Sequence, residues 1–166
     1  MHINLSPPPS ELEELAHLLT TRGETLSTAE SCTGGLISTL ITSLPGSSAW
    51  FTGGVVSYAN EIKTGLLNVP EEIIAAHGAV SEACALAMAS GAAKALHTTH
   101  CLAVTGIAGP GGGSPDKPVG TVWLAWSVAG QTTAKRHLFA GGRAEIRTLA
   151  AREALLGLIW LLKIKI

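Results

Sequence analysis

The spacing of apolar residues alternates along the chain between the period of a helix and the period of a strand. Recurrence at every third or fourth position predicts amphipathic helices, and short apolar or alternating runs predict strands. The predicted helices cover residues 10–22, 36–44, 61–67, 70–77, 83–96 and 143–163. The predicted strands cover residues 24–29, 50–58, 102–104, 119–128 and 131–139.

Predicted helices and strands alternate along most of the chain, and the last two strands follow each other as a hairpin. This order is typical of a layered α/β domain with a mixed sheet. We expect one domain over residues 10–166, without a linker or an internal repeat. The run Pro7-Pro8-Pro9 ends a stiff, extended lead-in over residues 1–9.

Capping and breaking residues set the expected ends of several elements. Ser10, with Glu13 three residues later, has the pattern of a capping box, and Gly23 is a helix stop. Ser81 is the expected N-cap of the fifth predicted helix. A glycine pair at 53–54 lies inside a predicted strand, where it indicates a bulge or the close approach of another backbone.

Three predicted strands end in residues that carry chemistry. The first is followed by Ser31, the second ends at Tyr58, and the third is followed by Thr105. Ligands of open α/β sheets bind outside the carboxyl ends of the strands. We therefore expect these three strand exits to share one crevice.

Ser31 lies in the stretch from Thr28 to Gly35, which is typical of a strand, a tight turn and a helix, with Gly34-Gly35 in the first helical turn. Amide N–H groups at a helix start lack partners within the helix, so a hydroxyl beside them suits an anion site or a nucleophile. A serine at this position is also a common N-cap, and no Gly-x-Ser-x-Gly elbow surrounds it. Both interpretations stay open on the local pattern.

A lysine supplies the base that a serine nucleophile needs. Lys63 follows Tyr58 by five residues, at the start of the next predicted helix. Desolvation there disfavours the ammonium form, so a neutral amine can accept the proton of Ser31 while the tyrosine hydroxyl relays or orients it. Such a pair performs acyl transfer without histidine. The alternative is an exposed lysine and a packed tyrosine.

The segment from Thr105 to Asp116 is a glycine-rich loop. It lacks the lysine that completes a Walker motif, and it contains no full Gly-x-Gly-x-x-Gly. Its glycines, including Gly106, Gly109 and Gly111, allow the backbone to approach a phosphate or a sugar closely. A plain surface loop is the alternative interpretation.

Two further groups of charged residues admit both a functional and a structural interpretation. Arg143 and Arg147 share a face at the start of the last predicted helix, which suits a phosphate; pairing with Glu145 or Glu11 is the alternative. Glu30, next to the candidate nucleophile, either pairs with a basic group or orients a substrate amide, or it is a structural carboxylate bound by nearby N–H groups.

Composition narrows the functional classes. Apolar residues make up 46% and charged residues 14% of the 166 residues, and the charged share lies below the usual value of about 25%. A surface with so few charges favours self-association. The net charge is −1 and no cluster of lysine or arginine occurs, so we expect no binding to nucleic acid.

Cysteines and histidines are scattered along the chain. Cys32, Cys84 and Cys101 form no Cys-x-x-Cys pair, and the six histidines have no metal-binding spacing, so we expect neither disulfides, nor a metal, nor a cofactor. The first residues show no signal-peptide pattern, and the apolar run over 154–166 is too short to span a bilayer. We therefore expect a soluble, cytoplasmic protein without a membrane partner.

Five blocks in order give the chain a resemblance to the CinA C-terminal domain family, over roughly Glu11 to Leu162. They are Ala29-Glu-Ser-Cys-Thr-Gly-Gly35, Gly46-Ser-Ser-Ala-Trp-Phe51, Tyr58-x-Asn-x-x-Lys63, His77-Gly-Ala-Val-Ser-Glu82, and Thr105-Gly-Ile-Ala-Gly-Pro-Gly-Gly-Gly-Ser-Pro115 with Pro118-Val-Gly-Thr-Val122. The resemblance implies a three-layer α/β/α sandwich. Stand-alone members of the family are nicotinamide-nucleotide amidases, and members form dimers or higher homo-oligomers.

The activity that the resemblance implies is hydrolysis of the carboxamide of nicotinamide mononucleotide to nicotinate mononucleotide and ammonia, which recycles pyridine nucleotides. It implies Ser31 as the nucleophile, activated by Lys63 and Tyr58. The expected substrate contacts, from the resemblance and from the strand exits together, are Glu30, Thr33, Gly34, Gly35, Ser48, Thr105, Gly106, Gly109, Gly111 and Arg143.

The chain departs from the family pattern before the last predicted helix. The family commonly has Gly-Asp-Arg where this chain has Gly141-Gly142-Arg143, so an acidic neighbour of the arginine is missing. Family members are often fused to an N-terminal nucleotide pyrophosphatase domain, and we do not assign that activity to this chain. Two alternatives are a nucleotide-binding or competence-associated interaction module without turnover, and an amidase for another small amide.

Overall fold

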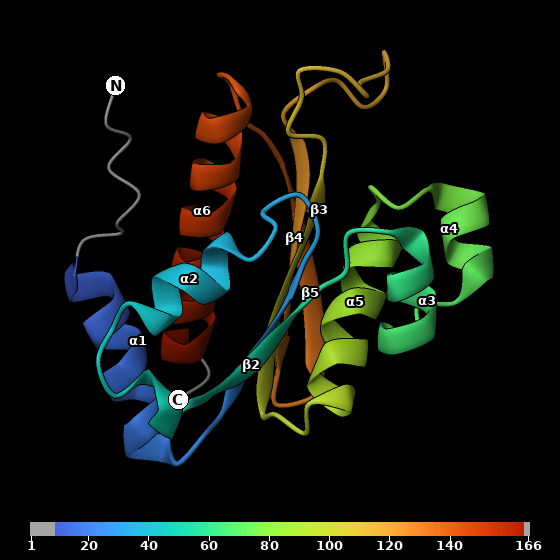
Figure 1. Cartoon of the computed structure of the whole chain (residues 1–166). Coiled ribbons are helices and arrows are strands. Elements are labelled where there is room, and N and C mark those ends of the chain that lie inside the picture. Colours follow the sequence, from blue (N-terminus) through green and yellow to red (C-terminus); the bar gives the residue numbers. More distant parts are fainter. Residues whose placement is uncertain (1–8, 165–166) are drawn as a thin grey trace.

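The computed structural model describes residues 9–164, and the part of the expected lead-in before Pro9 lies outside these residues. The described chain forms a five-stranded sheet between two helical layers (Figure 1). The sheet contains both parallel and antiparallel pairs. These observations confirm the predicted α/β/α sandwich with a mixed sheet.

The strand order is β2-β1-β3-β4-β5. At the centre of its parallel half, β1 (Leu26–Glu30) pairs with β2 (Phe51–Val56) on one side and β3 (His100–Gly106) on the other. The predicted hairpin of β4 (Thr121–Val128) and β5 (Gln131–Leu138) continues the sheet in antiparallel fashion. Because the first three strands run in the same direction, their carboxyl ends meet at one end of the sheet.

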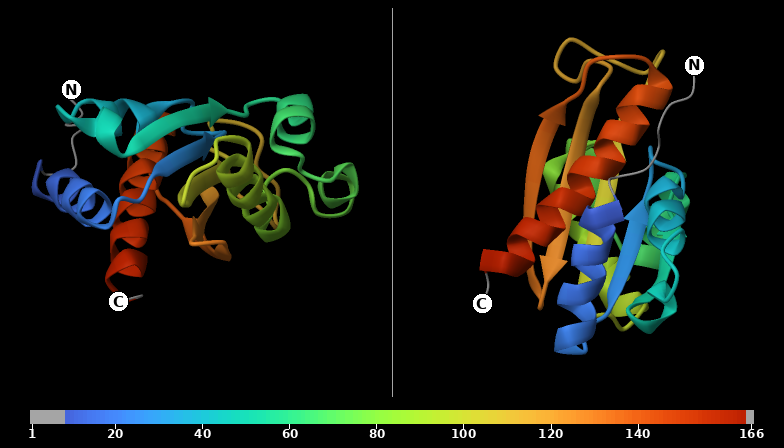
Figure 2. Two further views of the ribbon diagram at one scale, coloured as in Figure 1. Left: turned by 90° about the horizontal axis from the view of Figure 1, so that it is seen from below. Right: turned by 90° about the vertical axis from the view of Figure 1, so that its left-hand side faces the viewer.

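Helices cover both faces of the sheet, as Figures 1 and 2 show. The helices of one face are α1 (Pro9–Arg22), α2 (Leu36–Thr42) and α6 (Arg143–Ile164). Those of the other face are α3 (Asn60–Leu67), α4 (Glu71–His77) and α5 (Glu82–Ala95). A short 3-10 helix, η1 (Ser47–Ala49), precedes β2.

The two faces of the sheet bury different kinds of side chain. Large aliphatic residues of the sheet, such as Leu102 and Leu124, pack against α1, α2 and α6. On the opposite face, small residues such as Ala103 and Ala125 allow the alanine-rich α5 to lie close to the sheet. The apolar face of α6 is buried in the first of these cores, so it is not available to a partner chain; its residues are Leu155, Leu158, Ile159 and Leu162.

Two predictions about element ends were wrong. Ser10 lies inside α1, which the structure describes from Pro9 onward, so Ser10 is not the cap of this helix. The glycines Gly34 and Gly35 lie before α2 and not in its first turn, because both have the left-handed backbone conformation, with φ of 61° and 92°. The helix stop at Gly23 is confirmed: its φ is 64°, and the N–H of Glu24 donates to the carbonyl of Leu19 at 3.0 Å, as in a Schellman motif.

The glycine pair in β2, Gly53 and Gly54, coincides with both a bulge and a close approach to neighbouring elements. The pairing register with β1 shifts by one residue between Leu26 and Ser27, which is a bulge beside Gly53. A Cβ atom at Gly54 would lie 2.2 Å from Oγ1 of Thr28, so β2 approaches β1 and α2 too closely for any side chain there. Gly54 pairs with Thr28, which lies three residues before Ser31.

Candidate active site

The turn after β1 brings a serine and a lysine together. Ser31 is 9% exposed, and its backbone N–H donates to the carbonyl of Val104 on β3 at 2.9 Å, which fixes the turn to the sheet. Nζ of Lys63, on the first turn of α3, lies 3.3 Å from Oγ of Ser31. The two strand exits therefore share one site, as the sequence predicts.

Lys63 is buried to an unusual degree for a lysine, with 1% of its surface exposed. Its Nζ donates to the carbonyls of Ser57 at 2.7 Å and Tyr58 at 3.2 Å, in addition to its contact with Ser31. No salt bridge within residues 9–164 involves it. Burial lowers the pKa of Lys63 below its ordinary value, since desolvation disfavours the charged form.

The side chain of Tyr58 points away from this pair. The residue is 61% exposed, and its hydroxyl accepts a hydrogen bond of 3.3 Å from Nη2 of Arg143. The contact between Tyr58 and Lys63 runs through the tyrosine carbonyl. The structure thus brings Tyr58 to the site, but in this conformation its phenol contacts the arginine and not the lysine.

Arg143 connects the second strand exit with the glycine loop. Its Nη1 donates to the carbonyl of Gly109 at 2.8 Å, while Nη2 binds the Tyr58 hydroxyl. The N–H of Gly142, where the resemblance leads us to expect an aspartate, donates to Oε2 of Glu145 at 2.8 Å. The guanidinium of Arg143 is held by Gly109 and Tyr58, without an acidic neighbour at position 142.

Glu30 is a helix cap, and its expected role as a substrate contact does not fit the structure. One carboxylate oxygen accepts from the N–H groups of Gly35 and Ile37, both at 3.0 Å, and the other accepts from the N–H and the hydroxyl of Ser38, both at 2.8 Å. The side chain is buried. Both oxygens are bound by the start of α2, so neither is left to orient a substrate amide.

The rest of the turn after Ser31 is held by internal hydrogen bonds. The N–H of Gly34 donates to the carbonyl of Ser31 at 3.1 Å, and the N–H of Gly35 is taken by Glu30. Nη2 of Arg147 donates to the carbonyl of Thr33 at 2.7 Å. Arg147 therefore braces the turn instead of presenting its guanidinium to a phosphate, a role that its spacing from Arg143 did not reveal.

Two buried atoms near this turn have no hydrogen-bond partner within the described chain: Oγ1 of Thr33 and Nε of Arg147.

The thiol of Cys32, next to Ser31, is buried as well, and burial raises its pKa to about 12. Because the thiolate is the reactive form of cysteine, Cys32 remains an inert thiol beside Ser31.

At the end of β3, the hydroxyl of Thr105 is not free to bind a ligand, and the backbone conformation depends on glycine. The hydroxyl of Thr105 donates to the carbonyl of Ala79 at 2.8 Å and is buried. A Cβ at Gly106 would lie 2.8 Å from the carbonyl of Thr121, and Gly109 has a φ of 80°. Both positions thus require glycine, whereas Gly111 is exposed and has open space around it.

Ser48 is the expected site residue that the structure keeps away from Ser31. It is exposed on η1, which precedes the amino end of β2, whereas Tyr58 and Lys63 follow the carboxyl end of the same strand. Within one chain, Ser48 and Ser31 therefore lie at opposite ends of the parallel half of the sheet.

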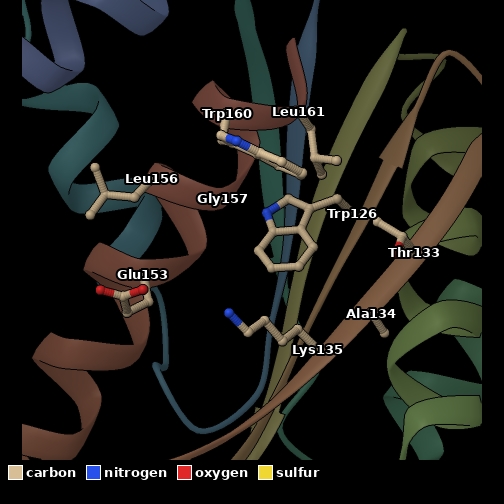
Figure 3. A pocket seen from close by; sticks show the side chains of 9 residues that line it. All are labelled: Trp126, Thr133, Ala134, Lys135, Glu153, Leu156, Gly157, Trp160 and Leu161. Atoms are coloured by element: carbon tan, nitrogen blue, oxygen red, sulfur yellow. The ribbon is translucent and has the colours of Figure 1, made fainter. Parts of the chain in front are cut away.

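A cavity of about 450 Å³ lies apart from this site, between α6 and β5 (Figure 3). The indole of Trp126 forms the floor of the cavity, and Trp160 lies at its rim. A Cβ atom at Gly157 would lie 2.3 Å from Cζ2 of Trp126, so the indole packs directly against this glycine. Lys135 and Glu153 project from the two walls of the cavity. The cavity borders the later turns of α6, whereas Arg143 begins that helix, so the cavity is not part of the candidate active site.

Residues 9–164 contain neither a metal-binding cluster of side chains nor a membrane-spanning helix. Histidine, cysteine, aspartate and glutamate side chains of residues 9–164 form no group of three or more that would hold a metal ion. In the same residues, no helix combines the length and the apolar character that crossing a membrane requires.

Two relatives align with more than four fifths of this chain at about half identity. A CinA-like protein from Gemmatimonas aurantiaca is 55% identical over 81% of this chain and 31% of its own length. Nicotinamide-nucleotide amidohydrolase PncC from Escherichia coli is 48% identical over 86% of this chain and 87% of its own length. The chain spans about a third of the length of the CinA-like relatives, and most of the length of PncC.

Solved structures share the fold as well. Competence damage-inducible protein A (ComA) from Klebsiella pneumoniae matches with a TM-score of 0.90 and 41% identity, over 93% of this chain and 96% of its own. The competence/damage inducible protein CihA from Agrobacterium tumefaciens matches with a TM-score of 0.89 and 43% identity, over 96% and 99%. The model of the CinA C-terminal domain matches residues 10–162, from α1 into the last turn of α6. The chain thus belongs to the CinA C-terminal domain family.

Proposed function

We propose that this chain is an amidase that hydrolyses the carboxamide of nicotinamide mononucleotide to nicotinate mononucleotide and ammonia. The observation that carries the proposal is the 3.3 Å contact between Oγ of Ser31 and Nζ of Lys63, at a place where burial lowers the pKa of the lysine. The name of the relative from Escherichia coli, a nicotinamide-nucleotide amidohydrolase, supplies the substrate class.

The first half of the reaction forms an acyl-enzyme. Neutral Lys63 accepts the proton of Ser31 while Oγ attacks the carboxamide carbon. The carbonyl oxygen becomes an oxyanion, and its donors come from the turn after Ser31. The N–H groups of Gly34 and Gly35 are occupied there, which leaves those of Cys32 and Thr33. Lys63 returns the proton to the leaving nitrogen, the C–N bond breaks, and ammonia departs.

The second half of the reaction releases the product. Lys63, again neutral, takes a proton from a water molecule, whose oxygen attacks the ester carbon on Ser31. The ester bond to Oγ breaks, and the serine regains its proton from the lysine. The carboxylate of nicotinate mononucleotide is the product, so one water is consumed for each ammonia released.

Arg143 and the glycine loop hold the 5′-phosphate and the ribose in this proposal. The guanidinium of Arg143 binds Tyr58 and Gly109 in the free protein. A phosphate that takes the Nη2 edge displaces the hydroxyl of Tyr58, whose exposed ring is free to turn toward Ser31 and Lys63. Tyr58 then relays or orients the proton, so its catalytic role depends on the phosphate of the substrate.

Ammonia release from nicotinamide mononucleotide tests the proposal. Ser31→Ala and Lys63→Met should each lower the rate by about a hundredfold or more, because each removes the nucleophile or its base. Lys94→Met, on the exposed end of α5, is the matched control and should keep the wild-type rate. Circular dichroism and thermal melting should show folded protein in all three.

Three results would overturn the proposal. Substantial turnover in both site variants would exclude the Ser–Lys mechanism. If the wild-type protein binds the nucleotide in calorimetry but releases no ammonia, the chain is a binding module. If it releases ammonia only from other small amides, its substrate is not nicotinamide mononucleotide.

A further inference from the structure

The cavity between α6 and β5, called the α6–β5 cavity, lies on a side of α6 that no other helix of the described residues covers. On the same face of the sheet, α1 and α2 lie on the opposite side of α6 (Figure 2). The side of α6 toward β5 presents residues spaced three or four apart: Glu153, Leu156, Gly157 and Trp160. Trp160 is 60% exposed at the rim, so its indole surface is open to a ligand.

The floor of the cavity is fixed before any ligand arrives. Nε1 of Trp126 donates to the carbonyl of Ala154 at 2.8 Å, which holds the ring against α6. Gly157 permits this contact, because a Cβ there would lie 2.3 Å from Cζ2 of the indole. The indole N–H is thus satisfied within the chain, and the carbon rings offer an apolar surface. With a volume of about 450 Å³, the cavity has the size of a small-molecule site.

The two ends of the α6–β5 cavity differ in chemistry. Glu153 lies about two turns before Trp160 on α6, which is roughly 10 Å along the helix axis. Lys135 projects from β5 toward the Glu153 end, and Leu161 lies with Trp160 at the other end (Figure 3). One end therefore carries two charges of opposite sign, and the other end is apolar and aromatic.

The two charges do not satisfy each other in the described chain. Lys135 and Glu153 form no salt bridge among residues 9–164, although they project from facing walls. A phosphate at this end would be attracted by Lys135 but repelled by Glu153, and a simple amine would meet the reverse. A ligand that carries a carboxylate and an ammonium group together satisfies both walls. The charge arrangement therefore favours a zwitterion.

We propose that the α6–β5 cavity is a binding site for a free aromatic α-amino acid. The carboxylate of the ligand accepts hydrogen bonds from Nζ of Lys135, and its ammonium group donates to the carboxylate of Glu153. The ring of the ligand lies over the indole of Trp126 and against Trp160, where aromatic contacts add to the burial of apolar surface. This site goes beyond the proposed amidase function and does not rest on it, because its residues are separate from those around Ser31.

Isothermal titration calorimetry with three ligands tests the charge pattern. L-Phenylalanine has both charges, hydrocinnamate lacks the ammonium group, and phenethylamine lacks the carboxylate. L-Phenylalanine should bind saturably, and each of the other two should bind about tenfold more weakly, because one charge-assisted contact is lost. Equal affinity for all three ligands would overturn the selection of a zwitterion.

Two variants connect each charge of the ligand with its partner in the protein. Lys135→Met should weaken the binding of L-phenylalanine about tenfold but leave the affinity for phenethylamine, which has no carboxylate, near that of the wild type. Glu153→Gln should have the same effect on L-phenylalanine and should not weaken hydrocinnamate, which has no ammonium group. Lys94→Met, on the far end of α5, is the matched control and should bind all three ligands like the wild type. Charge variants that leave the affinity for L-phenylalanine intact would contradict both contacts.

Trp160→Ala tests the aromatic end of the cavity. It should weaken all three ligands by a similar factor, because they share the phenyl ring, and Trp160→Phe should restore most of the affinity. The exposed position of Trp160 should keep both variants folded in circular dichroism. Unchanged affinity of Trp160→Ala for all three ligands would place the ring elsewhere and overturn the proposed pose.

A last measurement separates this site from the candidate active site. Ser31→Ala protein should bind L-phenylalanine with the affinity of the wild type, and saturating nicotinamide mononucleotide should not displace the amino acid. Displacement by the nucleotide would place the amino acid near Ser31 and overturn the proposal. An absence of saturable binding to the wild type would overturn it as well. A failure of ammonia release would overturn only the proposed amidase function, because these titrations measure binding alone.

Discussion

Oγ of Ser31 and Nζ of Lys63 lie 3.3 Å apart, although 32 positions separate the two residues in sequence. The other two acceptors around Nζ are backbone carbonyls, of Ser57 and Tyr58. Carbonyl dipoles satisfy the N–H groups of a lysine without supplying a full negative charge, so they offset only part of the cost of burying the ammonium. In the proposed mechanism, this environment lets Lys63 act as the base for the serine, without a histidine.

The first prediction concerns the pH dependence of the rate. Because burial lowers the pKa of Lys63, kcat/KM for ammonia release should rise with pH and level off with a midpoint below 10.5, the ordinary value of lysine. A pH–rate profile of the wild type measures the midpoint. His137→Gln is the control, since the pKa of His137 is also lowered by burial, but its ring lies on β5 and stacks on Phe139, the residue after that strand. A midpoint at 10.5, or one that moves with His137→Gln, would contradict the assignment.

The same pKa shift makes a prediction about stability. The unfolded chain binds the lysine proton more tightly than the folded chain, so the cost of burying the charge is full below the folded pKa and disappears as the pH rises toward 10.5. The unfolding free energy of the wild type relative to Lys63→Met should therefore increase between pH 7 and pH 10. Urea denaturation at the two pH values measures it. An unchanged difference would mean that Lys63 titrates normally in the fold.

Glu30→Gln tests the capping role of the carboxylate. The amide would keep the size of the side chain but turn an NH₂ group toward the N–H donors of Gly35, Ile37 or Ser38. The loss of these charge-assisted bonds should cost about 1–3 kcal/mol of unfolding free energy. Glu13→Gln, exposed on α1, should stay within about 0.5 kcal/mol of the wild type. A higher KM without any loss of stability would instead show that Glu30 contacts the substrate.

Arg143→Lys tests the phosphate contact. Lysine keeps the charge but loses the planar group that reaches both Gly109 and Tyr58. KM for nicotinamide mononucleotide should rise roughly tenfold, equivalent to about 1.4 kcal/mol, and turnover of the phosphate-free nicotinamide riboside should not change. Gly142→Asp restores the acidic residue of the family pattern and should leave KM near the wild-type value, because Glu145 already caps Gly142. An equal effect of Arg143→Lys on both substrates would exclude a phosphate role.

Much of the fold was predictable because periodicity and capping are local. The hairpin of β4 and β5, the stop at Gly23 and the cap at Ser81, whose hydroxyl accepts from the N–H of Cys84, all follow from short patterns. The start of α2 did not follow from such a pattern. The left-handed conformation of Gly34 and Gly35 is imposed by the turn, and the helix takes its cap from Glu30 on the preceding strand.

The site was predictable as a meeting of strand exits, because parallel strands end together. The contact of Ser31 with Lys63 agrees with that expectation. The bracing of the turn by Arg147 was not predictable, since the guanidinium reaches the carbonyl of Thr33 across 114 residues of sequence. The place of Ser48 at the far end of β2 was predictable, because Ser48 precedes the predicted strand over 50–58 and Tyr58 ends it.

The last prediction compares Gly54, where an added methyl group would clash with neighbouring side chains, with Gly65, where it would have open space. A Cβ at Gly54 would lie 2.2 Å from Oγ1 of Thr28 and 2.5 Å from Oγ of Ser38, whereas a Cβ at Gly65, inside α3, meets nothing within 4 Å. Gly54→Ala should lower the unfolding free energy by about 1–3 kcal/mol, and Gly65→Ala should raise it by about 0.5–1 kcal/mol through helix propensity. Urea denaturation of both variants measures the two effects.

The effect at Gly54 should extend to the active site. The hydroxyl of Ser38 binds Glu30, which caps α2 beside the turn of Ser31. A methyl group at 54 pushes Ser38 and disturbs this cap, so Gly54→Ala should lose ammonia release along with stability. Removing the obstructing hydroxyl in Gly54→Ala/Ser38→Ala should restore part of the stability lost to overpacking, which a double-mutant cycle measures. If Gly54→Ala matched Gly65→Ala in both stability and rate, the close contact of β2 with α2 would not constrain the site.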